Sequence, residues 1–132
     1  MKVAIIGSGG REHALCDSLK KSSKVNKIYC IPGNAGTDLI AENVKIELND
    51  FEAIKEFIKL NAIDLVLVGP EKPLVEGIVD FLEKHNVKVF GPNKIASQLE
   101  GSKAFTKNLC KKYNIPTANF GIFEDSKSAL NF

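Results

Sequence analysis

Five short aliphatic runs, separated by longer segments of helical periodicity, constrain the fold of this 132-residue chain more than any other feature. The runs are almost continuously apolar, which indicates strands that are buried on both faces. This alternation predicts an α/β fold, in which helices cover a parallel sheet. We expect the Rossmann-like strand order 3-2-1-4-5, with ligand-binding loops at the carboxyl edge. The expected strands are residues 3–6, 28–31, 44–48, 65–68 and 87–90.

Three apolar stripes with i, i+3 and i+4 spacing predict the helices that cover this sheet. Residues 34–43 are too short and too polar for a crossover helix, so we expect a loop or one distorted turn there. The stripes are Ala14, Leu15 and Leu19; Phe51, Ile54 and Ile58; and Leu74, Ile78 and Leu82.

The segment after Phe90 no longer alternates strands with helices. Its pattern predicts a short helical piece and then a helix that ends before Asn114 and Pro116. Residues 119–123 are expected to form a further strand, and Asp125 or Ser126 to cap another helix. A chain that stops inside a helix it has just capped is typical of a truncated or cleaved product. The apolar face of the longer helix carries Phe105, Leu109 and Tyr113.

Charge and cysteine usage narrow the classes of partner. The net charge is +2, and the basic pairs Lys20-Lys21 and Lys111-Lys112 lie on expected helix faces, which favours solvated surfaces over a nucleic-acid site. The three cysteines follow no disulfide or zinc pattern, so a reducing, cytoplasmic setting is expected. No signal-peptide layout and no apolar stretch of about 20 residues is present, so no membrane partner is expected.

A glycine loop, Gly7-Ser8-Gly9-Gly10, joins the first expected strand to the first expected helix. Glycines allow backbone N–H groups to approach an anion, and the helix N-terminus attracts negative charge, so the loop predicts a phosphate site. The dinucleotide fingerprint would need a third glycine where Glu12 stands and an acidic residue after the second strand. Neither is present, which argues against NAD. The alternative is a tight turn that needs glycine for its backbone.

Further loops follow the other strands. Pro32–Gly36 carries an amide side chain between glycines, which suits either an ordinary turn or a sugar phosphate. Glu71, between Pro70 and Pro73, is a candidate acceptor for ribose hydroxyls or an amine, with a simple first-turn glutamate as the alternative. Gly91-Pro92 adds a fourth small loop at the same expected edge.

Five segments along nearly the whole chain carry a resemblance to a known family: GSGGREHAL, PGNAG, VGPEKPLVEG, FGP and LEGSKAFTK with IPTA. In order and spacing they resemble the amino-terminal part of the phosphoribosylamine–glycine ligases, also called glycinamide ribonucleotide synthetases, which are ATP-grasp ligases. Lys72 departs from the pattern, because the family more often has a small residue there.

The resemblance implies a Rossmann-like, pre-ATP-grasp domain over residues 1–100 and the truncated beginning of an ATP-grasp domain over 101–132. It implies an enzyme of de novo purine biosynthesis that joins glycine to 5-phosphoribosylamine through glycyl phosphate, while ATP becomes ADP and phosphate. Mg²⁺ would bridge the ATP phosphates. Catalytic and metal residues are expected beyond Phe132, so these 132 residues alone are expected to be inactive. The partners are small molecules, and a monomer is favoured.

The resemblance also implies site residues. Lys103 and Lys107 lie on the helix where related ligases present a lysine to the nucleotide phosphates, and the resemblance does not decide between them. Their alternative role is as two exposed helix lysines. The implied phosphate-loop and substrate contacts are Gly9, Gly10, Arg11 and Glu12, with Asn34 and Glu71 near the ribose.

A second hypothesis is a stand-alone nucleotide-binding module, either an NAD(P)-dependent oxidoreductase domain or a ligand-sensing domain. The missing third glycine and the missing acidic residue count against NAD. A sensing module would need no continuation, whereas the newly begun helix indicates one.

Overall fold

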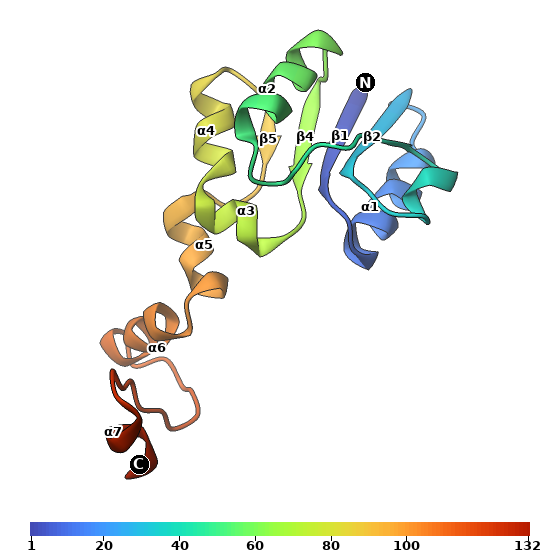
Figure 1. Cartoon of the computed structure of the whole chain (residues 1–132). Helices are drawn as coiled ribbons and strands as arrows, with labels where there is room; N and C mark the ends of the chain where they lie inside the picture. The colour runs from blue at the N-terminus through green and yellow to red at the C-terminus, as the bar shows by residue number, and fades with distance from the viewer. The chain divides into compact units, whose positions relative to one another are not determined.

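The computed structural model describes residues 1–132, and five parallel strands form the centre of its first compact unit, Met1–Ser97 (Figure 1). Their order is β3-β2-β1-β4-β5, and every neighbouring pair is parallel, so the predicted order is confirmed. β1 is the central strand, and its last residue, Gly7, pairs in register with Pro32. The strands are β1 (Lys2–Gly7), β2 (Lys27–Pro32), β3 (Glu42–Asn43), β4 (Leu65–Val68) and β5 (Val89–Phe90).

Helices cover both faces of this sheet. One face packs a large apolar cluster, including Ile6, Ile31 and Val66, against α2, α3 and α4. The other face packs Ile5 and Cys30 against α1. The near-continuous apolar strands are thus explained by burial on both sides. The helices are α1 (Gly10–Lys20), the 3-10 helix η1 (Thr37–Leu39), α2 (Phe51–Leu60), α3 (Glu71–Glu76) and α4 (Ile78–Lys84).

The buried face of α1 differs from the predicted stripe. Leu15 is 37% exposed and Ala14 is also exposed, whereas the fully buried side chains are Glu12 and Cys16, with Leu19 half-buried beside them. The stripe prediction considered only apolar residues, and Glu12 is a carboxylate whose burial depends on a hydrogen bond described below. The buried face of α1 therefore follows the i, i+4 spacing of Glu12 and Cys16.

The third strand is shorter than predicted and lies earlier in the chain. Only Glu42–Asn43 pairs with β2 as a strand, and the N–H of Val44 donates to Cys30 O at 2.9 Å. Residues 44–48 then leave the ladder, and Val44, Ile46 and Leu48 pack against the core as half-buried side chains. Their apolar alternation therefore reflects packing of an extended segment. The short turn predicted over 34–43 is confirmed as η1.

The residues from Gln98 onward form a second compact unit, separate from Met1–Ser97. Asp125 caps α7 through its Oδ1, which accepts from the Ser128 N–H at 2.8 Å, as the sequence predicted. The strand predicted over residues 119–123 is wrong, because that segment pairs with no neighbouring strand. The helices here are α5 (Lys94–Gly101), which begins in the first unit, α6 (Lys103–Lys112) and α7 (Ser126–Leu130).

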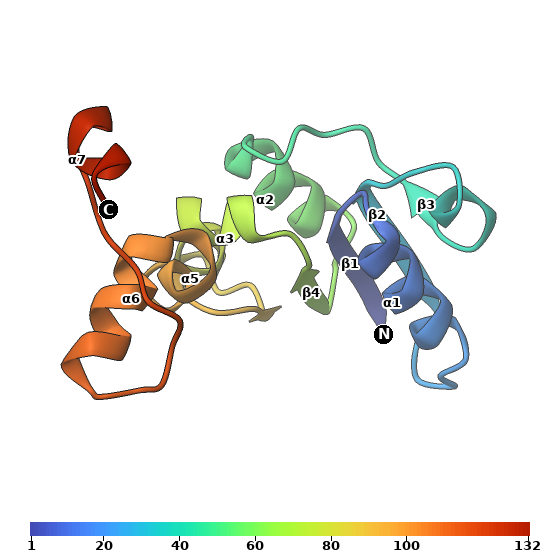
Figure 2. The same ribbon diagram turned by 90° about the horizontal axis from the view of Figure 1, so that it is seen from below.

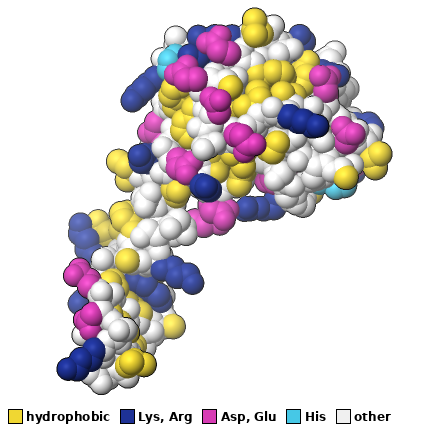
Figure 3. All heavy atoms as spheres, in the orientation of Figure 1, with side chains coloured by type: hydrophobic (Ala, Val, Ile, Leu, Met, Phe, Trp, Pro, Cys, Tyr) yellow, Lys and Arg dark blue, Asp and Glu magenta, His cyan; other side chains and the backbone are white.

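Acidic and basic side chains alternate over the face of the molecule drawn in Figure 3. None of the helices combines the length and the hydropathy that a membrane crossing requires.

Candidate functional site

The loops that follow β1, β2 and β4 are joined to one another at the carboxyl edge of the sheet. The N–H of Gly33 donates to Gly7 O at 3.1 Å, and the N–H of Gly69 donates to Ile6 O at 3.0 Å. Figure 2 shows α1 beside β1 and β2, so its N-terminus opens at this edge. The edge is the place where ligands bind in open parallel sheets.

Glu12 lies beneath the glycine loop. Glu12 is 2% exposed, and its Oε2 accepts from the Gly9 N–H at 2.6 Å, which is one half of a capping box at the start of α1, since Gly9 has no side chain to supply the other half. Its Oε1 is buried and has no hydrogen-bond partner. Among the residues implied as substrate contacts, Glu12 therefore holds the loop from inside, and the N–H of Gly9 is already engaged.

Gly10 opens α1, and its first-turn N–H has no acceptor within the helix, as in every α-helix. No atom lies within 4 Å of where a Cβ on Gly10 would stand. The helix dipole adds a partial positive charge at the same place. The first-turn N–H of Gly10 therefore suits an anion, and a side chain at this position would meet no other part of the structure outside the helix backbone.

Arg11 and Glu71 face each other from the first turns of α1 and α3, the helices that follow β1 and β4. The Arg11 Nη2 lies 3.1 Å from the Glu71 Oε2, and both side chains are more than half exposed. The pKa of Glu71 is lowered, first by its own backbone N–H and then by the Arg11 guanidinium. Glu71 is thus held as a carboxylate, a pure acceptor, beside a guanidinium that can bind phosphate. This contact brings the residues that follow β1 and β4 together at one edge of the sheet, as expected from the predicted strand order.

Asn34 bridges the second loop to the first. Its Nδ2 donates to Ser8 O at 2.8 Å and to Gly9 O at 3.3 Å. Its Oδ1 accepts from the N–H of Gly36 at 2.7 Å and of Thr37 at 3.0 Å. The carboxamide that the resemblance implies near the ribose is therefore occupied by backbone groups of both loops.

Two residues that the sequence analysis did not select support Asn34. The buried Thr37 hydroxyl accepts from the Asn34 N–H at 2.8 Å and lies 2.7 Å from Asn43 Oδ1. The Asn43 Nδ2 donates to Asn34 O at 2.7 Å. The spacing of Asn34 and Thr37 is a local turn signal that was available in the sequence. Asn43 carried no such signal, because its contact depends on the pairing of β3 with β2.

The fourth expected loop has a packing role. A Cβ on Gly91 would lie 3.0 Å from the side chains of Leu74 and Val79, so the chain here runs against α3 and α4. Gly91 is explained by this close approach.

Lys103 and Lys107 lie in the second compact unit, Gln98–Phe132. The Lys107 Nζ donates to Thr117 Oγ1 at 2.5 Å and to Ala118 O at 3.3 Å, and lies 5.2 Å from the centre of the Phe120 ring. Lys103 is exposed. Both lysines line a pocket of about 620 Å³ together with Phe120 and Asp125.

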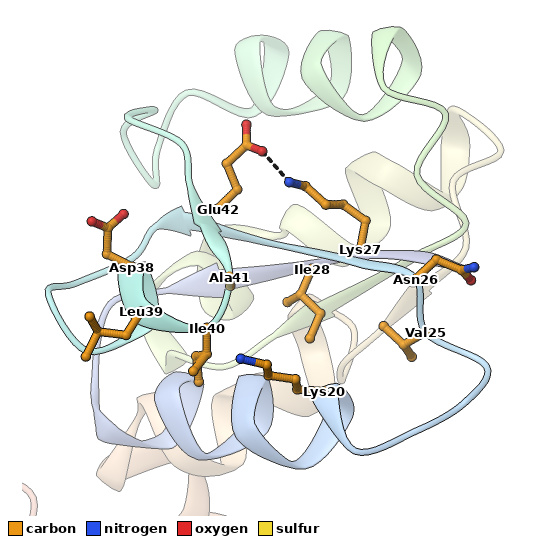
Figure 4. A pocket seen from close by; sticks show the side chains of 10 residues that line it. All are labelled: Lys20, Val25, Asn26, Lys27, Ile28, Asp38, Leu39, Ile40, Ala41 and Glu42. Carbon is orange, nitrogen blue, oxygen red and sulfur yellow. Dashed lines mark ion pairs between the residues drawn. The ribbon is translucent and has the colours of Figure 1, made fainter.

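Another pocket, of about 610 Å³, lies beside the amino-terminal end of β2 and includes none of the predicted site residues. Lys20, at the carboxyl end of α1, lines it together with the ion pair between Lys27 Nζ and Glu42 Oε2 at 2.6 Å (Figure 4). No group of three or more His, Cys, Asp or Glu side chains in the structure is arranged to hold a metal ion.

Comparisons with known proteins point in one direction. The family model described as phosphoribosylglycinamide synthetase, N domain, matches residues 1–100. The chain is 52% identical over 132 residues to a phosphoribosylamine–glycine ligase of Caldanaerobacter subterraneus, covering 100% of this chain and 32% of that protein. It is 53% identical over 129 residues to the ligase of the same name from Mesorhizobium japonicum, covering 98% and 30%.

A solved structure agrees with these sequence matches. The crystal structure of phosphoribosylamine–glycine ligase from Thermotoga maritima superposes with a TM-score of 0.70 at 33% identity, covering 99% of this chain and 29% of that one. The chain therefore spans about a third of the length of the curated relatives it matches.

Proposed function

The chain belongs to the phosphoribosylglycinamide synthetase N-domain family, and from that premise we propose that it binds 5-phosphoribosylamine for a ligase that joins this amine to glycine. In the proposed reaction ATP, glycine and 5-phosphoribosylamine give glycinamide ribonucleotide, ADP and phosphate. The observation that carries the proposal is the N-terminus of α1, where the first-turn Arg11 pairs with Glu71 at the start of α3. We further place this reaction in purine biosynthesis and in the cytoplasm, where free cysteines such as Cys16 and Cys30 stay reduced.

The donors at the start of α1 and the carboxylate of Glu71 have different chemical roles in the proposal. The first-turn N–H groups of α1 and the Arg11 guanidinium bind the 5-phosphate, because both are donors that carry positive charge. The Glu71 carboxylate accepts hydrogen bonds from the ribose hydroxyls or from the amine. Arg11 and Glu71 also neutralise each other when no substrate is bound, so the substrate replaces part of an existing ion pair.

The proposal assigns residues 1–100 to substrate binding and 101–132 to the beginning of an ATP-grasp domain. Lys103 and Lys107 suit the phosphates of ATP, because both residues line one pocket and each carries a positive charge. ATP would supply the phosphoryl group that activates the glycine carboxylate. The residues present do not form a Mg²⁺ site, so no metal ligand is assigned to this chain.

A titration followed by NMR tests the phosphate site. Ribose 5-phosphate is the probe, because phosphoribosylamine is chemically fragile. We expect weak binding that shifts the backbone amide signals of Gly9, Gly10 and Arg11, since a small ligand must still offset the entropy of association. NADH is the comparison ligand and should produce no such shifts. Tighter binding of NADH than of ribose 5-phosphate would overturn the proposal in favour of a dinucleotide site.

Arg11→Ala is the matching variant. It removes a charge-assisted contact and is expected to weaken ribose 5-phosphate binding by about 1.5–3 kcal/mol. Lys20→Ala is the control, because Lys20 lies about 13.5 Å from Arg11 along the same helix, beyond the Debye length at 0.1 M salt. Dissociation constants from the titration check both. Equal weakening by the two variants would indicate a nonspecific response to net charge and would contradict the assignment of Arg11.

A further inference from the structure

We propose that the Asn34 carboxamide is a positioning group that orients the peptide units of the glycine loop, so that the Gly9 N–H binds Glu12 and the Gly10 N–H is left for an anion. This inference rests on the proposed function, because the anion is taken to be the sugar phosphate. It assigns Asn34 a role different from the ribose contact that the family resemblance implies.

The carbonyl groups that precede α1 in the glycine loop are all hydrogen-bonded. Three consecutive carbonyl oxygens, those of Gly7, Ser8 and Gly9, accept hydrogen bonds from β2 or from the loop that follows it. Gly7 O accepts from the Gly33 N–H at 3.1 Å. The two hydrogens of the Asn34 Nδ2 are donated to Ser8 O at 2.8 Å and Gly9 O at 3.3 Å.

The direction of each loop N–H group follows from the planar trans peptide bond, in which the C=O of one residue and the N–H of the next point in opposite directions. Because Asn34 binds the carbonyl of Ser8, the N–H of Gly9 points away from Asn34, where Glu12 Oε2 accepts it. Gly9 O accepts both from Asn34 Nδ2 at 3.3 Å and from the His13 N–H at 3.2 Å, the first hydrogen bond of α1. Asn34 and the helix together therefore direct the Gly10 N–H away from Asn34. That N–H starts α1 and has no acceptor inside the helix.

The Asn34 side chain uses all of its hydrogen-bonding capacity within the protein. A carboxamide has two N–H donors and an oxygen with two lone pairs. Both donors bind the first loop, and the oxygen accepts from the N–H groups of Gly36 and Thr37. Nothing is left for a ribose hydroxyl, so Asn34 acts on the ligand through the loop.

Two anions distinguish the roles. Inorganic phosphate and ribose 5-phosphate are each titrated into the 132-residue chain and into Asn34→Ala. A positioning role predicts that both anions bind about tenfold more weakly, by the same factor, because one set of loop hydrogen bonds is lost. A ribose contact predicts that only ribose 5-phosphate binds more weakly, and that result would overturn the proposal.

A ligand-free measurement keeps the test decisive if Asn34→Ala does not fold. Asn34→Asp retains an oxygen for Gly36 and Thr37 but loses both donors. In this variant the carbonyl ¹³C signals of Ser8 and Gly9 are expected to shift, and the Gly10 amide signal with them. Unchanged carbonyl signals would show that Asn34 does not orient the loop.

Asn61→Ala is the matched control, because Asn61 also donates its Nδ2 to a backbone carbonyl, that of Phe57 at 2.9 Å, just before β4 begins at the other edge. It should leave the affinity for both anions and the signals of Ser8 and Gly9 unchanged. If the unaltered chain binds neither anion, the proposed function fails. The carbonyl signals of Asn34→Asp still decide whether Asn34 orients the loop.

Discussion

The contact between Gly69 and the buried Glu12 carboxylate joins the loops after β1 and β4 at the level of single atoms. A Cβ added at Gly69 would lie 2.0 Å from the Glu12 Oε1 and 2.7 Å from its carboxyl carbon. The Oε2 of the same carboxylate caps α1 through the Gly9 N–H. Glycine at position 69 therefore leaves room for the side chain that stabilises the phosphate loop.

Gly69→Ala is expected to destabilise the chain by about 1–3 kcal/mol or more, because a buried carboxylate must move to admit the methyl group. The free energy of unfolding in urea measures the effect. Gly10→Ala is the control, since no atom lies within 4 Å of its added Cβ, and it should be neutral or slightly stabilising.

A double-mutant cycle identifies the colliding group. In a Glu12→Ala background the collision is absent, so Gly69→Ala should lower the free energy of unfolding much less there than in the unaltered chain. Equal costs of Gly69→Ala in both backgrounds would show that Glu12 is not the group that requires glycine at position 69.

The raised pKa of the Cys16 thiol predicts that the stability of the fold decreases at alkaline pH. Burial, followed by the neighbouring Cys30, raises the pKa of Cys16 from 9.0 to about 12. Above pH 9 the unfolded chain loses this proton while the folded chain keeps it, so stability falls as pH rises, until the folded thiol also ionises near pH 12. The loss approaches about 1.4 kcal/mol per pH unit.

Urea unfolding at pH 8, 9 and 10 checks this expectation against Cys16→Ala, which has no thiol to ionise at that position. The unaltered chain should lose more stability than the variant over this range. Parallel curves would mean that the thiol does not stay protonated in the folded state. Because Cys30 is also buried and its pKa is also raised, the variant should retain some of the slope.

At the scale of elements, the break between α3 and α4 is the clearest departure from a simple helical pattern. The stripe through Leu74, Ile78 and Leu82 predicts one helix, and all three residues are buried. Gly77, with φ of +101°, ends α3 and starts α4 between them. The apolar spacing survives the break, so periodicity alone does not reveal it.

Gly77→Ala is expected to destabilise the chain by about 1–2 kcal/mol, the cost of placing an L-residue in the left-handed region. The neighbouring Glu76→Ala, at an exposed helical position, is the control and should change stability little. Thermal unfolding of the two variants compares them directly. A stabilised Gly77→Ala would show that the chain prefers one continuous helix here.

The same scale shows what the sequence can and cannot predict. β1, β2 and β4 follow from continuous apolar runs, because most side chains of β1 and β2 are buried and those of β4 are buried or half-buried. β3 does not, since only Glu42–Asn43 pairs and neither residue is apolar. The glycine loop and Glu71 were recognisable from their places after strands. The burial of Glu12 and the bridge from Asn34 depend on contacts between segments, which no local pattern contains.

At the scale of the whole molecule, the two units differ in how much they bury. α2 and α6 have the same length, 10 residues, but α2 buries Ile54 and Ile58, whereas α6 buries no residue. The stability of a helix in water comes mainly from packing of its apolar face. The two helices therefore form a matched pair for measuring local stability.

Hydrogen exchange is expected to be much slower in α2 than in α6, with protection differing by a factor on the order of 10³, because α6 opens without exposing a core. Deuterium uptake resolved by NMR at Ile58 and Leu109 measures the difference. Similar protection in both helices would contradict independent opening and indicate one cooperative unit.

β1 is the first strand along the chain and the middle strand of the sheet, and this position governs the order in which the molecule can be assembled. The Lys2 N–H binds the Asp64 carboxylate across 62 residues, and Arg11 meets Glu71 across 60. During synthesis the glycine loop leaves the ribosome long before the strand that completes its edge. The glycine loop therefore belongs to an incomplete sheet until β4 has emerged, since closing so long a span carries an entropy cost that only pairing with β4 offsets.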